Sequence, residues 1–258
     1  MREFLEDAAK HMDDGYGRAQ KLIQPELPKR FYKDVGVGTV GDAFAVTLDG
    51  KTPRTPGQKP VVVPSRDIAA AMAEEWAAQG EFINPETMPL VRLINTTVEA
   101  GDERVPALRD EVVKYAGTDL LLYRADTPRE LVAEQERLWD DALVRVARHF
   151  GVSFQPTIGI IHQAQPEATL SHLAQAVADE PLFPLAAMVS LTGLTGSALL
   201  TLALRHRLMD AEQVWLAAHV DEDHNIRLWG EVAEIVQRRA KRRAEYDAAV
   251  RVLETLSR

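Results

Sequence analysis

The sequence predicts an α+β N-terminal domain, built from short antiparallel strands and a helix, followed by an all-α C-terminal domain. Two observations support this fold class. Strand-like alternation and turn dipeptides are confined to the first third of the 258 residues. From Met88 onward, apolar residues recur at helical spacing nearly to the C-terminus. We therefore expect an N-terminal arm over residues 1–28, an α+β domain over 29–125 and an all-α domain over 126–258.

Turn and strand patterns define the expected α+β domain. Residues 31–37 and 43–48 have the composition of two strands joined by a turn. Asp49-Gly50 is a strong hairpin dipeptide because glycine adopts positive φ at low cost, so a third strand is expected over 51–55. A further short strand is expected over 60–64.

A helix is expected after Ser65, whose hydroxyl can accept backbone N–H bonds as an N-cap. The residues that recur every four positions and should face a core are Ile68, Met72 and Trp76. The polar residues that should stay in solvent are Glu74, Glu75 and Gln79. Pro85 and Pro89 should then keep residues 82–90 extended.

Helical patterns occupy the rest of the chain. Helices are expected over residues 90–99, 103–115, 129–150, 167–179, 185–191 and 197–206, and from Ala211 onward. The uncharged stretch 182–204 has the length of a membrane span. Pro184, Gly193 and Gly196 interrupt it, so two buried helices that meet near the glycines are expected, without membrane insertion.

Composition limits the kinds of site that this chain can hold. Apolar residues make up 46% of the sequence, which is enough to bury a core. The formal net charge of −9 disfavours nucleic acid and anionic membrane as partners. The absence of cysteine excludes disulfides and cysteine-ligated metals. The acidic first 20 residues fit neither a secretory signal nor a transit peptide. We expect a monomeric protein of the bacterial cytoplasm.

Catalytic and cofactor motifs are missing from the sequence. There is no phosphate-binding glycine loop, no nucleophile elbow and no HExxH pair, so no catalytic, cofactor or metal site is expected. His219 and His224 are five residues apart, which puts their rings about 140° apart on a helix and favours a solvated polar face over a metal site. The alternative that stays open is a small-molecule enzyme with an acidic site between the two domains.

A basic run at residues 238–243 follows an acidic stretch at residues 219–234. Helical geometry spreads the basic residues around the axis, so a solvated helix is expected rather than a site for nucleic acid or lipid. The acidic and basic segments could together form a dipolar surface for a charged partner.

Several unusual strings occur in one order along the chain. They are Phe31-Tyr32-Lys33, Leu48-Asp49-Gly50-Lys51-Thr52-Pro53-Arg54, Glu74-Glu75-Trp76, Met88-Pro89-Leu90, Asn95-Thr96-Thr97, Tyr115-Ala116-Gly117-Thr118-Asp119-Leu120-Leu121-Leu122-Tyr123-Arg124, Gln135 with Trp139-Asp140, and Asp221-Glu222 leading to Trp229-Gly230-Glu231. Together they resemble the assembly-chaperone family for the alpha subunit of the catalytic sector of ATP synthase, known from mitochondria and related bacteria. The resemblance extends over about residues 29 to 240. Leu122 departs from it, because many relatives have cysteine there.

The resemblance implies an ATP-independent chaperone and not an enzyme. It would bind the free alpha subunit, shield the surface later covered by the beta subunit, and release its client to the assembling hexamer. The eukaryotic relatives would act in the mitochondrial matrix. Physical reasoning agrees, because an unassembled subunit exposes an apolar interface that is liable to aggregate.

The resemblance also implies a critical acidic residue in the C-terminal domain. The candidates for this residue are Glu222, Asp223, Glu231 and Glu234. On one helix Glu231 and Glu234 would share a face. Trp229 is either an interface anchor or a core tryptophan. The N-terminal candidates for packing or partner contact are Phe31, Tyr32 and Met88.

Overall fold

A computed structural model describes residues 27–256 of the chain, so the expected arm lies outside the described residues except for its last two positions. The described residues fall into two units. One contains residues 27–31 and 78–84, which pair through backbone bonds: Arg30 N–H donates to the Glu81 carbonyl at 2.8 Å and Ile83 N–H to the Pro28 carbonyl at 2.8 Å. The other unit contains residues 32–77 and 85–256.

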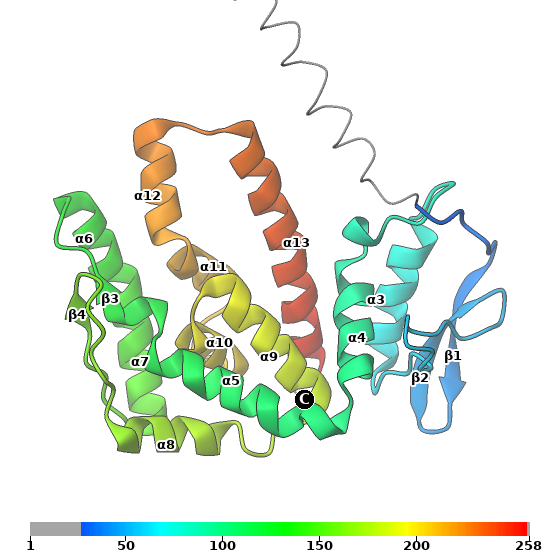
Figure 1. Ribbon diagram of the computed structural model, residues 1–258, viewed down its shortest axis with the longest axis horizontal. Coiled ribbons are helices and arrows are strands. Elements are labelled where there is room, and N and C mark those ends of the chain that lie inside the picture. The colour runs from blue at the N-terminus through cyan, green and yellow to red at the C-terminus, as the bar shows by residue number, and fades with distance from the viewer. Residues whose placement is uncertain (1–26, 257–258) are drawn as a thin grey trace, which may run out of the picture. The chain divides into compact units, whose positions relative to one another are not determined.

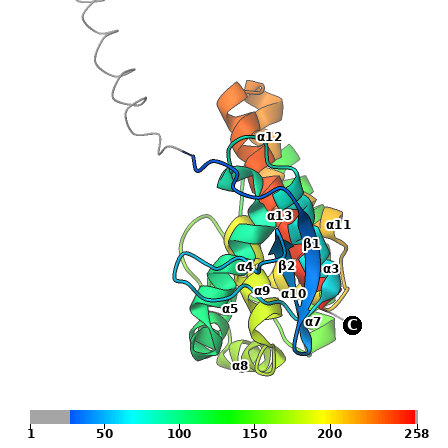
Figure 2. The ribbon, with the colours of Figure 1, turned by 90° about the vertical axis from the view of Figure 1, so that its right-hand side faces the viewer.

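The larger unit begins with an antiparallel hairpin, β1 (Val35–Val40) and β2 (Ala43–Leu48), with Val37 opposite Val46. Helix α3 (Arg66–Ala77) packs on both strands (Figures 1 and 2). The expected cap forms, because the Ser65 hydroxyl accepts the Asp67 N–H at 3.2 Å. Ile68 and Met72 are buried, as their spacing predicts.

The two further strands predicted for this region do not form. Residues 51–55 and 60–64 make only single bridges, Leu48 to Lys51, Arg54 to Pro60 and Phe44 to Val63. Prolines within and beside these segments lack an N–H, so a continuous ladder cannot extend through them.

The predicted extended segment 82–90 is also wrong in its second half. Residues Pro85–Thr87 form a 3₁₀ turn, and α4 (Pro89–Ala100) starts at the proline itself. Proline is tolerated there because its missing N–H would have no partner in a first helical turn. Glu75, expected in solvent, accepts the N–H groups of Leu90 and Val91 at 2.9 and 2.8 Å and so caps α4.

Gln79 was likewise expected in solvent and is buried. Its side-chain carbonyl accepts the Asn84 N–H at 2.7 Å. Amphipathic spacing cannot reveal such a role, because it depends on a loop that returns to the end of the helix.

The remainder of the larger unit is almost entirely helical, and the fold class is confirmed. Its elements are η2 (Asp102–Arg104), α5 (Val105–Gly117), η3 (Leu120–Leu122), β3 (Tyr123–Arg124), α6 (Arg129–Gln135), a π-helical turn η4 (Glu136–Asp140), α7 (Asp141–Phe150), β4 (Thr157–Ile158), α8 (Glu167–Ala176), α9 (Leu182–Thr195), α10 (Ala198–Arg205), α11 (Ala211–Ala218), α12 (Val220–Trp229) and α13 (Ala233–Thr255). Strands β3 and β4 pair in parallel. The domain boundary at 125/126 remains a prediction.

Helices α9 and α10 form the centre of this helical region (Figure 1). Helices α4, α5 and α13 pack on α9, while α5, α7 and α11 pack on α10. The stretch 182–204 is thus divided into two buried helices, as its glycines predict, and Gly196 ends the first at φ 69°. No helix within residues 27–256 is long and apolar enough to span a membrane.

A buried carboxylate fixes the start of α10. Asp119 accepts the N–H groups of Leu121 at 3.1 Å and of Leu199 at 2.9 Å. The Ser197 hydroxyl, at the N-cap, accepts the Leu200 N–H at 3.0 Å. Complete burial nevertheless raises the pKa of Asp119 to about 6, because desolvation outweighs these hydrogen bonds.

Candidate partner-binding surface

Helix α12 turns two of its acidic side chains, Glu222 and Asp223, toward α13. Arg239 lies 2.5 Å from an Asp223 oxygen and 3.9 Å from a Glu222 oxygen. Arg242 contacts the same Glu222 oxygen at 3.4 Å. Glu222 and Asp223 are therefore largely occupied by cations of the chain itself, and they hold α12 against α13.

The basic run 238–243 is correspondingly not a simply solvated helix face. Arg242 also donates to the Leu194 carbonyl of α9 at 3.0 Å. Arg243 pairs with Glu212 at 2.8 Å and lies 5.1 Å from the centre of the Trp215 ring. Lys241 reaches Glu86 at 2.8 Å. The run ties α13 to its neighbours, which leaves little of the predicted dipolar surface.

His219 is buried behind these charges. Its Nδ1 bonds the Trp215 carbonyl at 2.8 Å, and the two rings stack with centroids 3.9 Å apart. Burial lowers the pKa of His219, and Arg242 and Arg239 lower it further. A neutral imidazole that donates from Nδ1 to the Trp215 carbonyl fits this site.

The predicted solvated face for His219 and His224 is wrong, because both rings are buried. The described residues contain no group of three potential metal ligands. The sequence could not reveal this burial, since α12 carries few apolar residues and packs through polar contacts.

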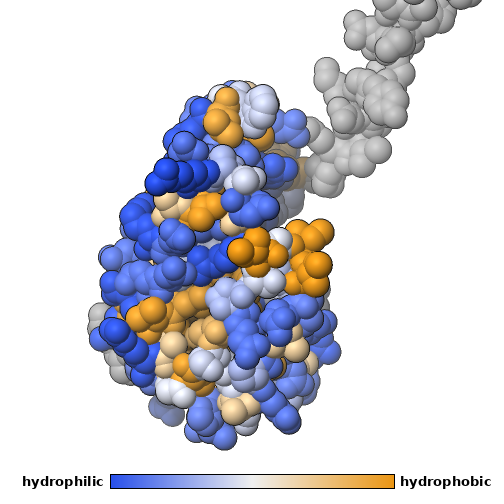
Figure 3. All heavy atoms as spheres, turned by 90° about the vertical axis from the view of Figure 1, so that its left-hand side faces the viewer, coloured by the Kyte–Doolittle hydropathy of each residue, from blue (hydrophilic) through white to orange (hydrophobic). Residues whose placement is uncertain are grey.

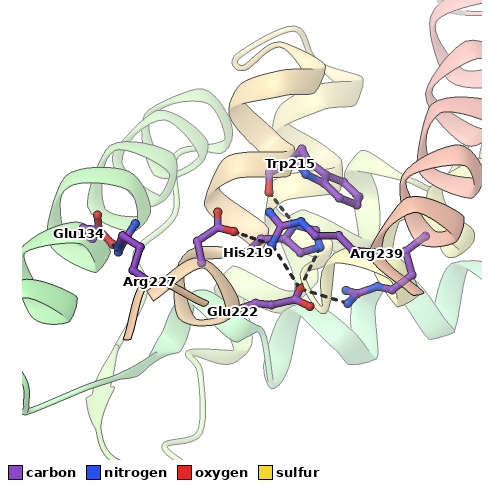
Figure 4. A network of polar contacts seen from close by, with 8 residues as sticks. Glu134, Trp215, His219, Glu222, Arg227 and Arg239 are labelled. Carbon is purple, nitrogen blue, oxygen red and sulfur yellow. Dashed lines mark hydrogen bonds and ion pairs between the residues drawn. The ribbon is translucent and has the colours of Figure 1, made fainter. Parts of the chain in front are cut away.

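The opposite side of α12 is fixed to α6. Gln135 donates to an Asp221 oxygen at 2.8 Å, and Arg227 forms an ion pair with Glu134 (Figure 4). Trp139, which follows α6, is fully buried and donates to the Ala217 carbonyl at 2.7 Å. Helix α12 is therefore clamped from both sides.

Beyond this clamped section, the end of α12 carries an exposed apolar cluster. Trp229 is 84% exposed, which excludes the alternative of a core tryptophan. The apolar tip, as we name it, consists of Leu228, Trp229, Val232 and Val236, all of them exposed. Sequence reasoning missed the three aliphatic members. Their position on either side of Gly230, within an otherwise charged stretch, is the signal that could have found them.

Glu231 and Glu234 flank the apolar tip and are exposed. Gly230 has a φ of 81°, which ends α12, and α13 begins only at Ala233. The predicted spacing of the two glutamates along one helix is therefore wrong, since Glu231 lies in the connection. Beside it, a depression of about 410 Å³ has walls that include Ile226, Ile235 and Val236.

The three N-terminal candidates for partner contact differ in how far they are exposed. Phe31 is 71% exposed, so it can contact a partner. Tyr32 is buried, donates to the Trp76 carbonyl at 2.7 Å and packs edge-on against the Trp76 ring. Met88 is buried just before α4. For Tyr32 and Met88 the structure favours packing over partner contact.

A cavity between the two predicted domains lacks the acidic lining that the enzyme alternative requires. Between α4, α5, α9 and α13 lies a cavity of about 520 Å³. Most of its walls are aliphatic side chains and threonines, and its one carboxylate, Glu245, is paired with Arg92. No set of converging carboxylates and histidines lines it, so this cavity gives no support to acid–base catalysis.

Comparison with known proteins identifies relatives along most of the chain. Residues 29–147 match the family model described as ATP12 chaperone protein. The mitochondrial protein atp12 of Schizosaccharomyces pombe is 20% identical over 225 residues, which are 83% of this chain and 77% of that protein.

Solved structures extend the similarity to both parts of the fold. Atp12 from Paracoccus denitrificans is 34% identical with a TM-score of 0.79, covering 90% of this chain and 99% of that one. A protein from Agrobacterium tumefaciens is 40% identical with a TM-score of 0.84, covering 94% of this chain and 91% of that one.

Proposed function

The chain belongs to the ATP12 chaperone family, which serves ATP synthase assembly, and from this premise we propose that it binds the free alpha subunit of the catalytic sector. In this proposal it acts without ATP and without catalysis. It shields the subunit interface that would otherwise aggregate, and it releases the alpha subunit when the beta subunit competes for the same surface. The observation that carries the proposal is the apolar tip.

The apolar tip has the properties of a contact surface. An exposed tryptophan with exposed aliphatic residues close by in the chain is a typical anchor, because tryptophan is enriched among residues that dominate binding energy. Exposed apolar groups that are rimmed by charge commonly mark a binding site. The clamp formed by α6 and α13 fixes α12, so little conformational entropy is lost on binding.

The acidic candidates divide into two roles. Glu222 and Asp223 position the apolar tip through Arg239 and Arg242. Glu231 and Glu234 lie beside the tip, exposed, and can pair with basic groups of the client. We propose Phe31 as a further contact, whereas Tyr32 and Met88 support the fold from within.

The cellular setting follows from the relatives and the charge. The bacterial relatives and the acidic composition suit a monomeric protein of the bacterial cytoplasm, while the fission yeast relative is named as mitochondrial. The sequence contains no phosphate-binding glycine loop, which suits exchange of the client without nucleotide.

The test replaces Trp229 and measures binding and aggregation of the alpha subunit. Trp229→Ala should weaken binding of the isolated alpha subunit at least about tenfold, because one large aromatic contact is lost. The readouts are titration calorimetry and light scattering during aggregation of the alpha subunit. Val40→Ala, at the exposed end of β1, is the matched control and should protect like the wild type. A wild-type protein that neither binds the alpha subunit nor slows its aggregation would refute the proposal.

A further inference from the structure

The loop between β4 and α8 exposes a second apolar cluster. Ile158, Ile160 and Ile161 are 70%, 94% and 79% exposed. Isoleucine is among the residue types most often buried in proteins, so three of them within four positions on the surface are unusual. We name residues 157–161 the isoleucine loop.

The isoleucine loop is held in place by polar contacts behind it. The side-chain carbonyl of Gln165, a buried residue, accepts the Gln155 N–H at 2.9 Å. The Gln165 amide donates to the carbonyls of Gln155 and Gln163 at 3.0 and 3.1 Å. The Tyr123 hydroxyl meets His162 at 3.0 Å. The isoleucines are therefore presented by a braced segment, which reduces the entropy lost on binding.

One edge of this segment is available for backbone pairing. β4 pairs in parallel with β3, and the Gly159 N–H donates to the Arg124 carbonyl at 2.8 Å. Because backbone groups alternate sides along a strand, those of Ile158 face away from β3. Among residues 27–256, β4 has no strand neighbour on that side. An extended peptide could add there, with the isoleucines in contact with its side chains.

The isoleucine loop is connected through polar links to the start of α12, the helix that ends in the apolar tip. Arg124 of β3 donates to the Gln135 carbonyl at 3.2 Å and pairs with Asp140 at 2.7 Å. Gln135 in turn holds Asp221 of α12. Figure 3 views the side on which α6, β4 and α12 lie in Figure 1, and apolar surface appears there in more than one place.

Charge favours a protein over a membrane as the occupant. Glu136 and Asp140 border a hollow beside Ile158. The chain carries a net charge of −9, so an anionic lipid surface would be repelled. A braced loop with one open strand edge suits an extended polypeptide better than a lipid headgroup.

We propose that the isoleucine loop is a second client-binding element, which takes an extended apolar segment of the same alpha subunit that the apolar tip contacts. The proposal rests on the proposed function and adds a second point of attachment. When the alpha subunit is held at two sites, one contact can open while the other still holds it. The beta subunit can then displace the chaperone in steps.

The test removes the apolar groups and leaves the backbone in place. The double variant Ile160→Ser, Ile161→Ser should bind the isolated alpha subunit about tenfold or more weakly, chiefly through faster dissociation. Combined with Trp229→Ala, the two losses should multiply, because the sites make separate contacts. Val40→Ser is the matched control, and thermal melts should show that all variants remain folded.

Hydrogen exchange of the complex checks the mode of binding. The amides of Ile158 and Ile160 should be protected when the alpha subunit is bound. Client binding that is weakened by Trp229→Ala but unchanged in the isoleucine variant would overturn this inference alone. Absence of any client binding by the wild type would overturn it together with the proposed function. An isoleucine variant that binds the alpha subunit normally and loses only self-association, or only binding to phosphatidylglycerol vesicles, would also overturn this inference.

Discussion

The centre of the helical region and the apolar tip distribute their side chains in opposite ways. Around α9 and α10, apolar side chains are inside, and Leu185, Leu199 and Leu200 are fully buried. Between α12 and α13, His219 is buried and the paired Glu222 and Arg239 are half-buried, whereas Trp229 is in solvent. Burial of apolar area stabilises the first region, and ion pairs hold the second.

This difference means that one region chiefly determines the stability of the fold and the other is available for binding. A region held by polar contacts can leave its apolar groups uncovered, and those groups remain available to a partner. A residue of the centre and a residue of the tip should therefore respond differently to the same kind of change.

The largest expected effect is on the free energy of unfolding. Leu199→Ala should lower it by about 3 kcal/mol, because a cavity forms in the centre. Trp229→Ala should change it by less than about 0.5 kcal/mol, since the side chain is mostly exposed. Urea denaturation of both variants checks the comparison. A large loss of stability in the tryptophan variant would show that the tip is part of the core.

Charge reversal at Glu222, in the clamped part of α12, should have a smaller effect on the free energy of unfolding. Glu222→Lys would add a third cation beside Arg239 and Arg242, and should cost about 1–2 kcal/mol of unfolding free energy and weaken client protection. The matched control is Glu234→Lys, whose exposed side chain has no ion pair with another described residue. It should keep wild-type stability in the same denaturation experiment. Equal stability of the two variants would contradict the clamp.

The smallest effect is a pH response of opposite sign in the two regions. The pKa of Asp119 is about 6 in the folded state and ordinarily 3.8. Burial of the ionised carboxylate therefore lowers the free energy of unfolding at neutral pH, and this loss disappears as the pH falls and the carboxyl is protonated. From about pH 7.5 to about pH 5 the wild type should gain about 1 kcal/mol relative to Asp119→Asn.

His219 should respond in the other direction. Its folded pKa is lowered from 6.5, so acid protonates the unfolded state first and destabilises the protein. The wild type should lose stability on acidification relative to His219→Gln. Denaturation midpoints across this pH range report both differences, and parallel pH profiles for wild type and variants would contradict them.

Local chemistry made much of the fold predictable. The glycines at 193 and 196 indicated where the apolar stretch divides, and Ser65 indicated where α3 begins. Prediction failed where distant segments decide the structure. Glu75 caps a helix fifteen positions onward, and the expected ladder after Asp49-Gly50 ends at the Leu48–Lys51 bridge, since Pro53 on the second strand lacks an N–H.

The candidate site was predictable only as a region. The acidic stretch and Trp229 could be found from the sequence, but their roles depend on which side chains α13 and α6 neutralise. Gly230 changes the chain direction between Glu231 and Glu234, and a helical projection cannot show that. The isoleucine loop carries no motif, because its exposure is a property of the folded chain alone.

Helix α13 has a consequence for the order of events during synthesis. Its residues Tyr246, Ala249 and Leu253 are buried, and the helix packs on α9, α4 and α3, elements that emerge from the ribosome much earlier. A nascent chain must therefore extend past Leu253, and clear the exit tunnel, before this packing can close. Until then the apolar faces of α4 and α9 stay open, so this member of an assembly-chaperone family passes through an exposed stage of its own.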